Sequence, residues 1–258
     1  MFLPDNIPII CNFPRDIEYA DIFFLHDIHF GSDLFDEQKW KSVKKKIQDN
    51  EFAYVCWIGD VMENAIPNSK SDMFTQTHSP AQQKEWASQE MFDLRKKTIA
   101  VVSGNHEHNR TTKACGLYPL YDVCMLAGID GKYRDTIAYL DIGIGIRSDK
   151  KRQIHYFGQI QHASRECSNY GYSDYTDGID FFAFGHDHRP MDRPRAKMVF
   201  DQHNKVVYKR NIENINCGSF CKFGGYGAKG AYRPQSDKMY KLRIFGGEKK
   251  METTGFYV

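Results

Sequence analysis

Residues 22–29 read IFFLHDIH: an apolar run typical of a buried strand is followed by a polar group that contains Asp27 and His29. The same order recurs at four later points of the chain. The later polar groups are Gly59-Asp60, Gly104-Asn105-His106-Glu107, His162 and Gly185-His186-Asp187-His188. Because the carboxyl ends of strands in an α/β sheet share one edge, where ligands bind, we expect these groups to meet in one place.

Hydrophobic periodicity predicts the strands and helices around these groups. In the first half, strands are expected over 22–25, 53–58 and 98–102. Helices are expected from Ser32 or Asp33 to about Lys46, from Pro80 to Lys97, and from Pro119 to Ala127, ending at Gly128. The second half is expected to be rich in strands, over 136–140, 142–146, 153–160, 179–184, 197–201, 205–209, 211–216 and 238–245.

In order and residue type, the five polar groups resemble the DxH, GD, GNH(E/D), His and GHxH motifs of the calcineurin-like metallophosphoesterase superfamily. The resemblance runs from about Asp21 to about Arg189 and is closest to compact bacterial and phage-type members. It implies an α/β fold, a four-layer α-β-β-α sandwich of two mixed sheets flanked by helices, where composition alone indicates only α/β. A single domain over residues 1–258 is expected, because no linker, low-complexity block or repeat divides the chain.

Carried over to this chain, the resemblance implies two divalent metal ions that share the carboxylate of Asp60. One ion would be held by Asp27, His29, Asp60 and His188, and the other by Asp60, Asn105, His162 and His186. A bridging carboxylate can serve two cations about 3.5–4 Å apart, and Asn adds an oxygen ligand without charge. Manganese is the expected metal, with Fe, Zn, Ni and Mg as alternatives.

His106 directly follows the expected ligand Asn105, so in an extended turn it points in another direction and is available for catalysis. The resemblance implies that His106 contacts the phosphoryl group and either protonates the leaving oxygen or stabilises the developing charge. The nucleophile would be a hydroxide that bridges the metals, which makes Asp60 catalytic as well. Asn105, His106 and Arg165 are the expected substrate-binding residues; for Arg165, an ordinary surface loop is an equal alternative.

Several polar residues beside the motifs have two open interpretations. Glu63, Asn64, His26 and Glu107 either orient the ligands through hydrogen bonds or are simply polar neighbours at strand ends. His155 is the rival of His162 as the fourth ligand group. We favour His162 because it follows its apolar run, whereas His155 lies inside that run.

The favoured function is hydrolysis of a phosphodiester, with DNA or RNA among the candidate substrates. Phosphomonoester hydrolysis and a catalytically idle metal-binding scaffold remain alternatives, because one metal core serves several functions. A structural zinc protein is disfavoured because the motifs contain no cysteine. A net charge of +2 with 26% charged residues excludes neither nucleic acid nor small substrates.

Cysteine usage and the N-terminal sequence bear on location. The seven cysteines form no CxxC pair, which favours a reduced intracellular protein. The N-terminus lacks a basic segment followed by a long apolar stretch, and no run reaches the length of a membrane span. We therefore expect a cytoplasmic protein without a membrane partner; its oligomeric state is left open.

Overall fold

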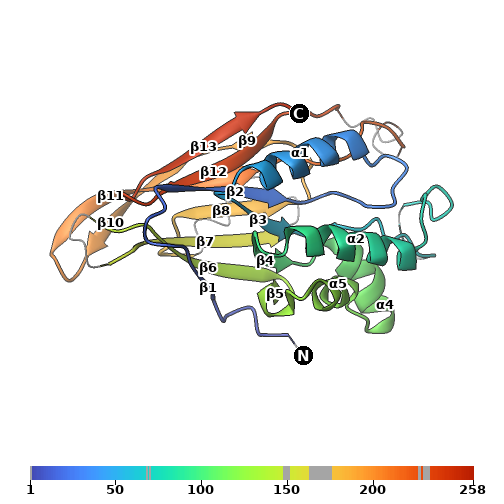
Figure 1. The fold of residues 1–258 in the computed structure, drawn as a ribbon, viewed down its shortest axis with the longest axis horizontal. Helices are drawn as coiled ribbons and strands as arrows, with labels where there is room; N and C mark the ends of the chain where they lie inside the picture. The colour runs from blue at the N-terminus through green and yellow to red at the C-terminus, as the bar shows by residue number, and fades with distance from the viewer. Residues whose placement is uncertain are drawn as a thin grey trace.

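The structure, a computed structural model, describes residues 2–67, 69, 71–147, 152–162, 176–225, 228 and 233–258. Two mixed β-sheets form its centre, and helices flank them (Figure 1). This confirms the α/β class with two mixed sheets flanked by helices.

One sheet has six strands in the order β13-β12-β2-β3-β4-β5. Strands β2 to β5 run parallel, while β12 pairs antiparallel with both β2 and β13. The carboxyl ends of β2, β3 and β4 therefore lie at one edge. The strands are β2 (Tyr19–Leu25), β3 (Ala53–Ile58), β4 (Thr98–Val102), β5 (Tyr133–Arg134), β12 (Met239–Phe245) and β13 (Met251–Phe256).

The other sheet has seven strands, six of them in the order β1-β6-β7-β8-β11-β10, and β9 pairs with β11. Strands β7 and β8 are parallel, with His162 opposite Gly185, so their carboxyl ends also coincide. The strands are β1 (Ile9–Asn12), β6 (Ile137–Ile144), β7 (Ile154–His162), β8 (Phe181–Gly185), β9 (Met191–Asp192), β10 (Arg195–Asp201) and β11 (Val206–Asn216).

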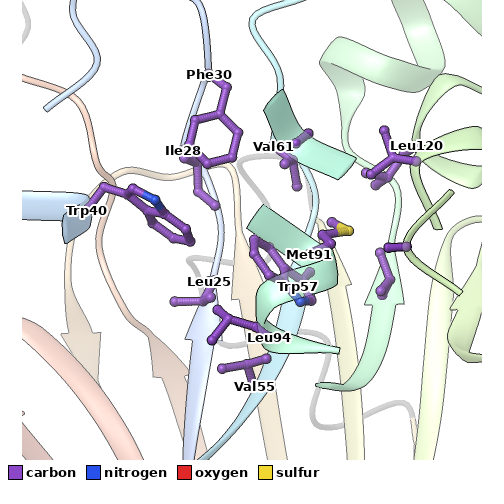
Figure 2. Close-up of a cluster of buried hydrophobic side chains, with 14 of the residues drawn as sticks. Leu25, Ile28, Phe30, Trp40, Val55, Trp57, Val61, Met91, Leu94 and Leu120 are labelled. Atoms are coloured by element: carbon purple, nitrogen blue, oxygen red, sulfur yellow. The ribbon is translucent and has the colours of Figure 1, made fainter. Parts of the chain in front are cut away.

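Two apolar clusters hold these layers together. The first joins the facing sides of the two sheets through residues such as Phe24, Ile58 and Phe181. The second lies between the six-stranded sheet and helices α1 (Glu37–Asp49), α2 (Pro80–Leu94) and α5 (Pro119–Ala127). Figure 2 shows Trp40 of α1 and Trp57 of β3 in this second cluster, with Met91 and Leu94 of α2.

The helix starts differ from the prediction at one point. Helix α1 begins at Glu37, after the predicted Ser32 or Asp33, because the carboxylate of Asp36 accepts from the backbone N–H of Lys39 at 3.0 Å. Helix α2 begins at Pro80 as predicted, after a Ser79 cap, but ends at Leu94 rather than Lys97. Helix α5 has the predicted bounds and ends at Gly128, whose φ of 70° suits glycine.

The observed strands differ from the prediction more than the helices do. The two segments predicted over 136–140 and 142–146 form the single strand β6, because Asp141 points to the outer face without breaking the strand. The segments predicted over 197–201 and 205–209 pair antiparallel as β10 and the start of β11, and β11 continues through the segment predicted over 211–216 to Asn216. Strands β1, β5, β9 and β13 were not predicted. Among the described residues, no helix is long and apolar enough to cross a membrane.

Candidate metal centre

Sharp turns carry the polar groups away from the strand ends. Four residues at these turns have positive φ without being glycine: Asp27 (49°), His29 (56°), Asp60 (48°) and His186 (79°). Such conformations are strained for L-residues and cluster at functional sites. Gly104 permits the closest approach, because a Cβ there would collide with the backbone nitrogen of Asp60. The turns after β3 and β4 are thereby packed together.

The first ligand group consists of Asp27, His29 and His188, whose ligand atoms lie within 4.8 Å of one another. Asp27 Oδ1 is 3.4 Å from Nε2 of His188 and 3.9 Å from Nε2 of His29. Asp27 is fully buried and His29 nearly so. Three of the four residues expected for one metal are therefore together.

The second ligand group consists of Asp60, His162 and His186. His162 Nε2 lies 3.2 Å from Asp60 Oδ2 and 3.0 Å from the side-chain oxygen of Asn105. The same Asn105 oxygen is 2.6 Å from Nδ1 of His186. All four residues expected for the other metal thus converge on one point.

A third group, made of His29, Asp60 and His106, connects the first two. His106 Nε2 is 3.7 Å from Asp60 Oδ2, and the two Nδ1 atoms of His106 and His29 are 3.1 Å apart. His106 therefore lies within ligand distance of the same residues as the metal ligands.

The described residues fit divalent metal ions. Asp27 Oδ1 and His29 Nε2 are buried and have no hydrogen-bond partner in the described part of the chain, although burial without a partner is costly. His162 is oriented as ligating histidines usually are, because its Nδ1 lies 2.7 Å from the backbone oxygen of Ile58. That contact leaves Nε2 directed at Asp60 and Asn105.

The electrostatic field of the site favours positive charge. Burial alone would lower the pKa of His162, but the negative charges of Asp60 and Asp27 raise it to about 10. Burial would raise the pKa of Asp27, yet the neighbouring His188 and the hydrogen bond from His26 hold it well below its usual value. His106 differs: its burial lowers its pKa to about 3.

His26 and Glu107 support the ligands. His26 accepts from the backbone N–H of Cys217 at 3.1 Å, so its Nδ1–H donates to Asp27 Oδ2 at 2.6 Å. The Glu107 carboxylate accepts from four backbone N–H groups in the turns after β3 and β4. Both residues therefore position the turns and ligands, which favours the first of their two interpretations.

Glu63 and Asn64 also contact the site. Glu63 Oε2 lies 3.1 Å from Nδ1 of His29. Burial would raise the pKa of Glu63, but the hydrogen bond with His29 lowers it far below the usual value. Asn64 donates to the backbone oxygen of His106 at 3.0 Å, and its own N–H donates to Gln83 of α2 at 2.7 Å.

Two residues of this region were not found from the sequence. Gln83 comes from helix α2, and Arg110 from the π-helical turn η1 (His108–Thr112). The only sequence signal for Arg110 is its place four residues after His106.

His155, the rival of His162, pairs instead with Asp141 on the outer sheet face at 2.6 Å. Arg165 lies outside the described residues.

Comparisons with known proteins give little further information. No family model and no curated protein matches the chain. Among solved structures, it is similar to Vps29 of Chaetomium thermophilum, with 11% identity and a TM-score of 0.38. The match covers 93% of this chain and 95% of that chain.

Proposed function

We propose that this protein is a metal-dependent phosphoester hydrolase of the calcineurin-like metallophosphoesterase superfamily. One observation carries the proposal: two groups of buried and partly buried ligand residues are joined by a third that shares His29 with one and Asp60 with the other. Such a chain of ligands suits two neighbouring cations better than one closed site. The Asp, His and Asn ligands favour manganese, with Fe, Zn, Ni and Mg as alternatives.

The chemistry that a pair of divalent ions supplies in such a site is Lewis-acid activation of water and of the phosphoryl group. The chain's own residues would position the ions and the phosphoryl group. Asp60 keeps one oxygen for this purpose, because its Oδ1 already accepts from the N–H of His106 at 2.8 Å while Oδ2 faces His162. Asn105 contributes a neutral oxygen.

His106 would assist the leaving group. Its ring is nearly buried, at 12% side-chain exposure, beside Asp60. Water is therefore largely excluded from the ring, and a hydrogen bond from it to a phosphoryl or leaving oxygen is strong. We propose Asn105, His106 and Arg165 as substrate-binding residues and Asp60 with His106 as the catalytic pair.

We propose a phosphodiester as the substrate, with DNA or RNA as candidates; a phosphomonoester is the alternative. The buried ligands and the nearby cation Arg110 support binding of a phosphoryl group. They do not distinguish between the leaving groups of a diester and a monoester. Free thiols at every described cysteine agree with the proposed cytoplasmic location.

The test is hydrolysis of bis-p-nitrophenyl phosphate and p-nitrophenyl phosphate by manganese-reconstituted protein, with and without a chelator. We expect turnover of the diester that the chelator abolishes. Turnover of the monoester alone would favour a phosphatase. Stoichiometric metal binding without turnover of any phosphoester, with any of the divalent metals, would instead favour an idle metal-binding scaffold.

A further inference from the structure

Arg110 has contacts that the proposed roles of Asp60, Asn105 and His106 do not use. Its guanidinium group donates through Nη2 to Nε2 of His106 at 2.9 Å and to Oγ of Ser71 at 2.8 Å. Through Nη1 it donates to the carboxylate of Glu63 at 3.0 Å and also to the backbone oxygen of Glu63. Only 10% of the side chain is exposed.

The fold places Arg110 and His106 on the same side of one turn. They are four residues apart, and the π-helical turn η1 carries Arg110. Asn64 clamps this turn, because its side-chain amide donates both to the backbone oxygen of His106 and to Oγ1 of Thr111. Helical irregularities of this kind are frequent at functional sites. Asn64 therefore holds the backbone turn that carries both side chains.

The hydrogen bond between Arg110 and His106 is informative because its direction is fixed. Arginine only donates, so Nε2 of His106 must accept in this arrangement. Glu63 and Ser71 already anchor the guanidinium, so its contact with His106 is additional to that anchoring. A phosphoryl oxygen that takes the place of Nε2 would accept from the same Nη2–H group of Arg110, and planar guanidinium groups suit phosphoryl oxygens especially well.

We infer that Arg110 is a substrate-binding residue whose Nη2–H group, which here points at His106, donates to one oxygen of the phosphoryl group. The inference rests on the proposed function and narrows it, because it names a cation of the chain that the phosphoryl group contacts. The charge of Glu63 does not cancel that cation completely, since its carboxylate is shared between Arg110 and His29.

The test measures binding of inorganic phosphate by calorimetry to manganese-loaded protein from which excess metal has been removed. The variants are Arg110→Gln and Arg110→Lys. The control is Arg15→Gln, which removes an exposed cation before β2, at the opposite end of that strand from the ligands. Metal content by mass spectrometry and KM and kcat with bis-p-nitrophenyl phosphate complete the comparison.

We expect Arg110→Gln to weaken phosphate binding about 10- to 100-fold, the range for a lost charge-assisted hydrogen bond, while metal content stays at the wild-type value. Arg110→Lys should weaken it less, because charge remains but the planar fork is lost. Arg15→Gln should bind phosphate as the wild type does.

Wild-type phosphate affinity in metal-loaded Arg110→Gln would overturn the inference. If that variant fails to fold or loses metal, Arg110→Lys decides: wild-type affinity overturns the inference, and so does misfolding of both variants, which would make Arg110 structural. Arg110-dependent phosphate binding without any hydrolysis by the wild type would instead refute the proposed function alone. Hydrolysis with phosphate binding independent of Arg110 would refute only the inference.

Discussion

Replacing Glu107 by glutamine tests how the turns beneath the ligands are held. The Glu107 carboxylate is fully buried. One of its oxygens accepts from the N–H groups of Val61 at 2.8 Å and Met62 at 3.0 Å. The other accepts from those of Asp60 and Gly104, both at 3.0 Å. All four donors belong to the turns that carry Asp60 and Asn105.

The expected loss of unfolding free energy follows from the number of these N–H donors. Whichever way the side-chain amide of the Glu107→Gln variant is turned, its NH2 group faces two backbone N–H groups that then lack an acceptor. At about 1–3 kcal/mol for each unsatisfied buried group, the variant should lose about 2–6 kcal/mol of unfolding free energy. That is a large part of a typical stability of about 5–15 kcal/mol.

Urea unfolding in the presence of chelator, followed by tryptophan fluorescence, measures this loss without a contribution from metal binding. The matched control is Asp122→Asn, because that carboxylate is 37% exposed and should change stability little. Burial and the charge of Asp60 raise the pKa of Glu107. A loss below about 1 kcal/mol would mean that the folded protein holds a neutral Glu107, and the donor argument would be refuted.

Three further variants test other parts of the structure. Asp60→Asn should abolish hydrolysis and reduce bound metal, measured by mass spectrometry, because Asp60 belongs to the second and third ligand groups and is the carboxylate that the two ions are proposed to share; full metal content would contradict this. His106→Ala should lower kcat by about 10²–10⁴ with metals retained; loss of metal would instead identify His106 as a ligand. Asp21→Asn should cost about 1–3 kcal/mol at neutral pH, because Asp21 is buried and pairs with Lys241 and Arg243. Burial alone would raise the pKa of Asp21, but these partners lower it, so its contribution is present at neutral pH and is lost as the pH falls through the folded-state value. Wild-type and variant stabilities that fail to converge in acid would count against this account.

The ligand positions were accessible from sequence because each depends on a local pattern. An apolar run predicts a strand, and the next polar residues must then lie at its carboxyl end, which is how Asp27, Asp60 and Asn105 were found. His162 was chosen because it follows its run; the structure makes it the last residue of β7, opposite Gly185. The strand is longer than its apolar core.

Other features depend on contacts that local patterns do not encode. Gln83 and Arg110 reach Asn64 and Glu63 across intervals of 19 and 47 residues, and nothing in the intervening sequence specifies the approach. The short edge strands β1 and β13 also escaped prediction, because half-exposed segments such as Ile9–Asn12 lack a continuous apolar run. Pairing with a neighbouring strand, rather than intrinsic preference, makes them strands.

The left-handed residues at the ligand turns have a consequence for engineering. Asp27, His29, Asp60 and His186 hold backbone shapes in which glycine would be more comfortable. Selection for thermal stability without a screen for activity should therefore favour glycine at these four positions and remove proposed metal ligands. Thermostabilised variants of this protein would need a separate screen for metal binding.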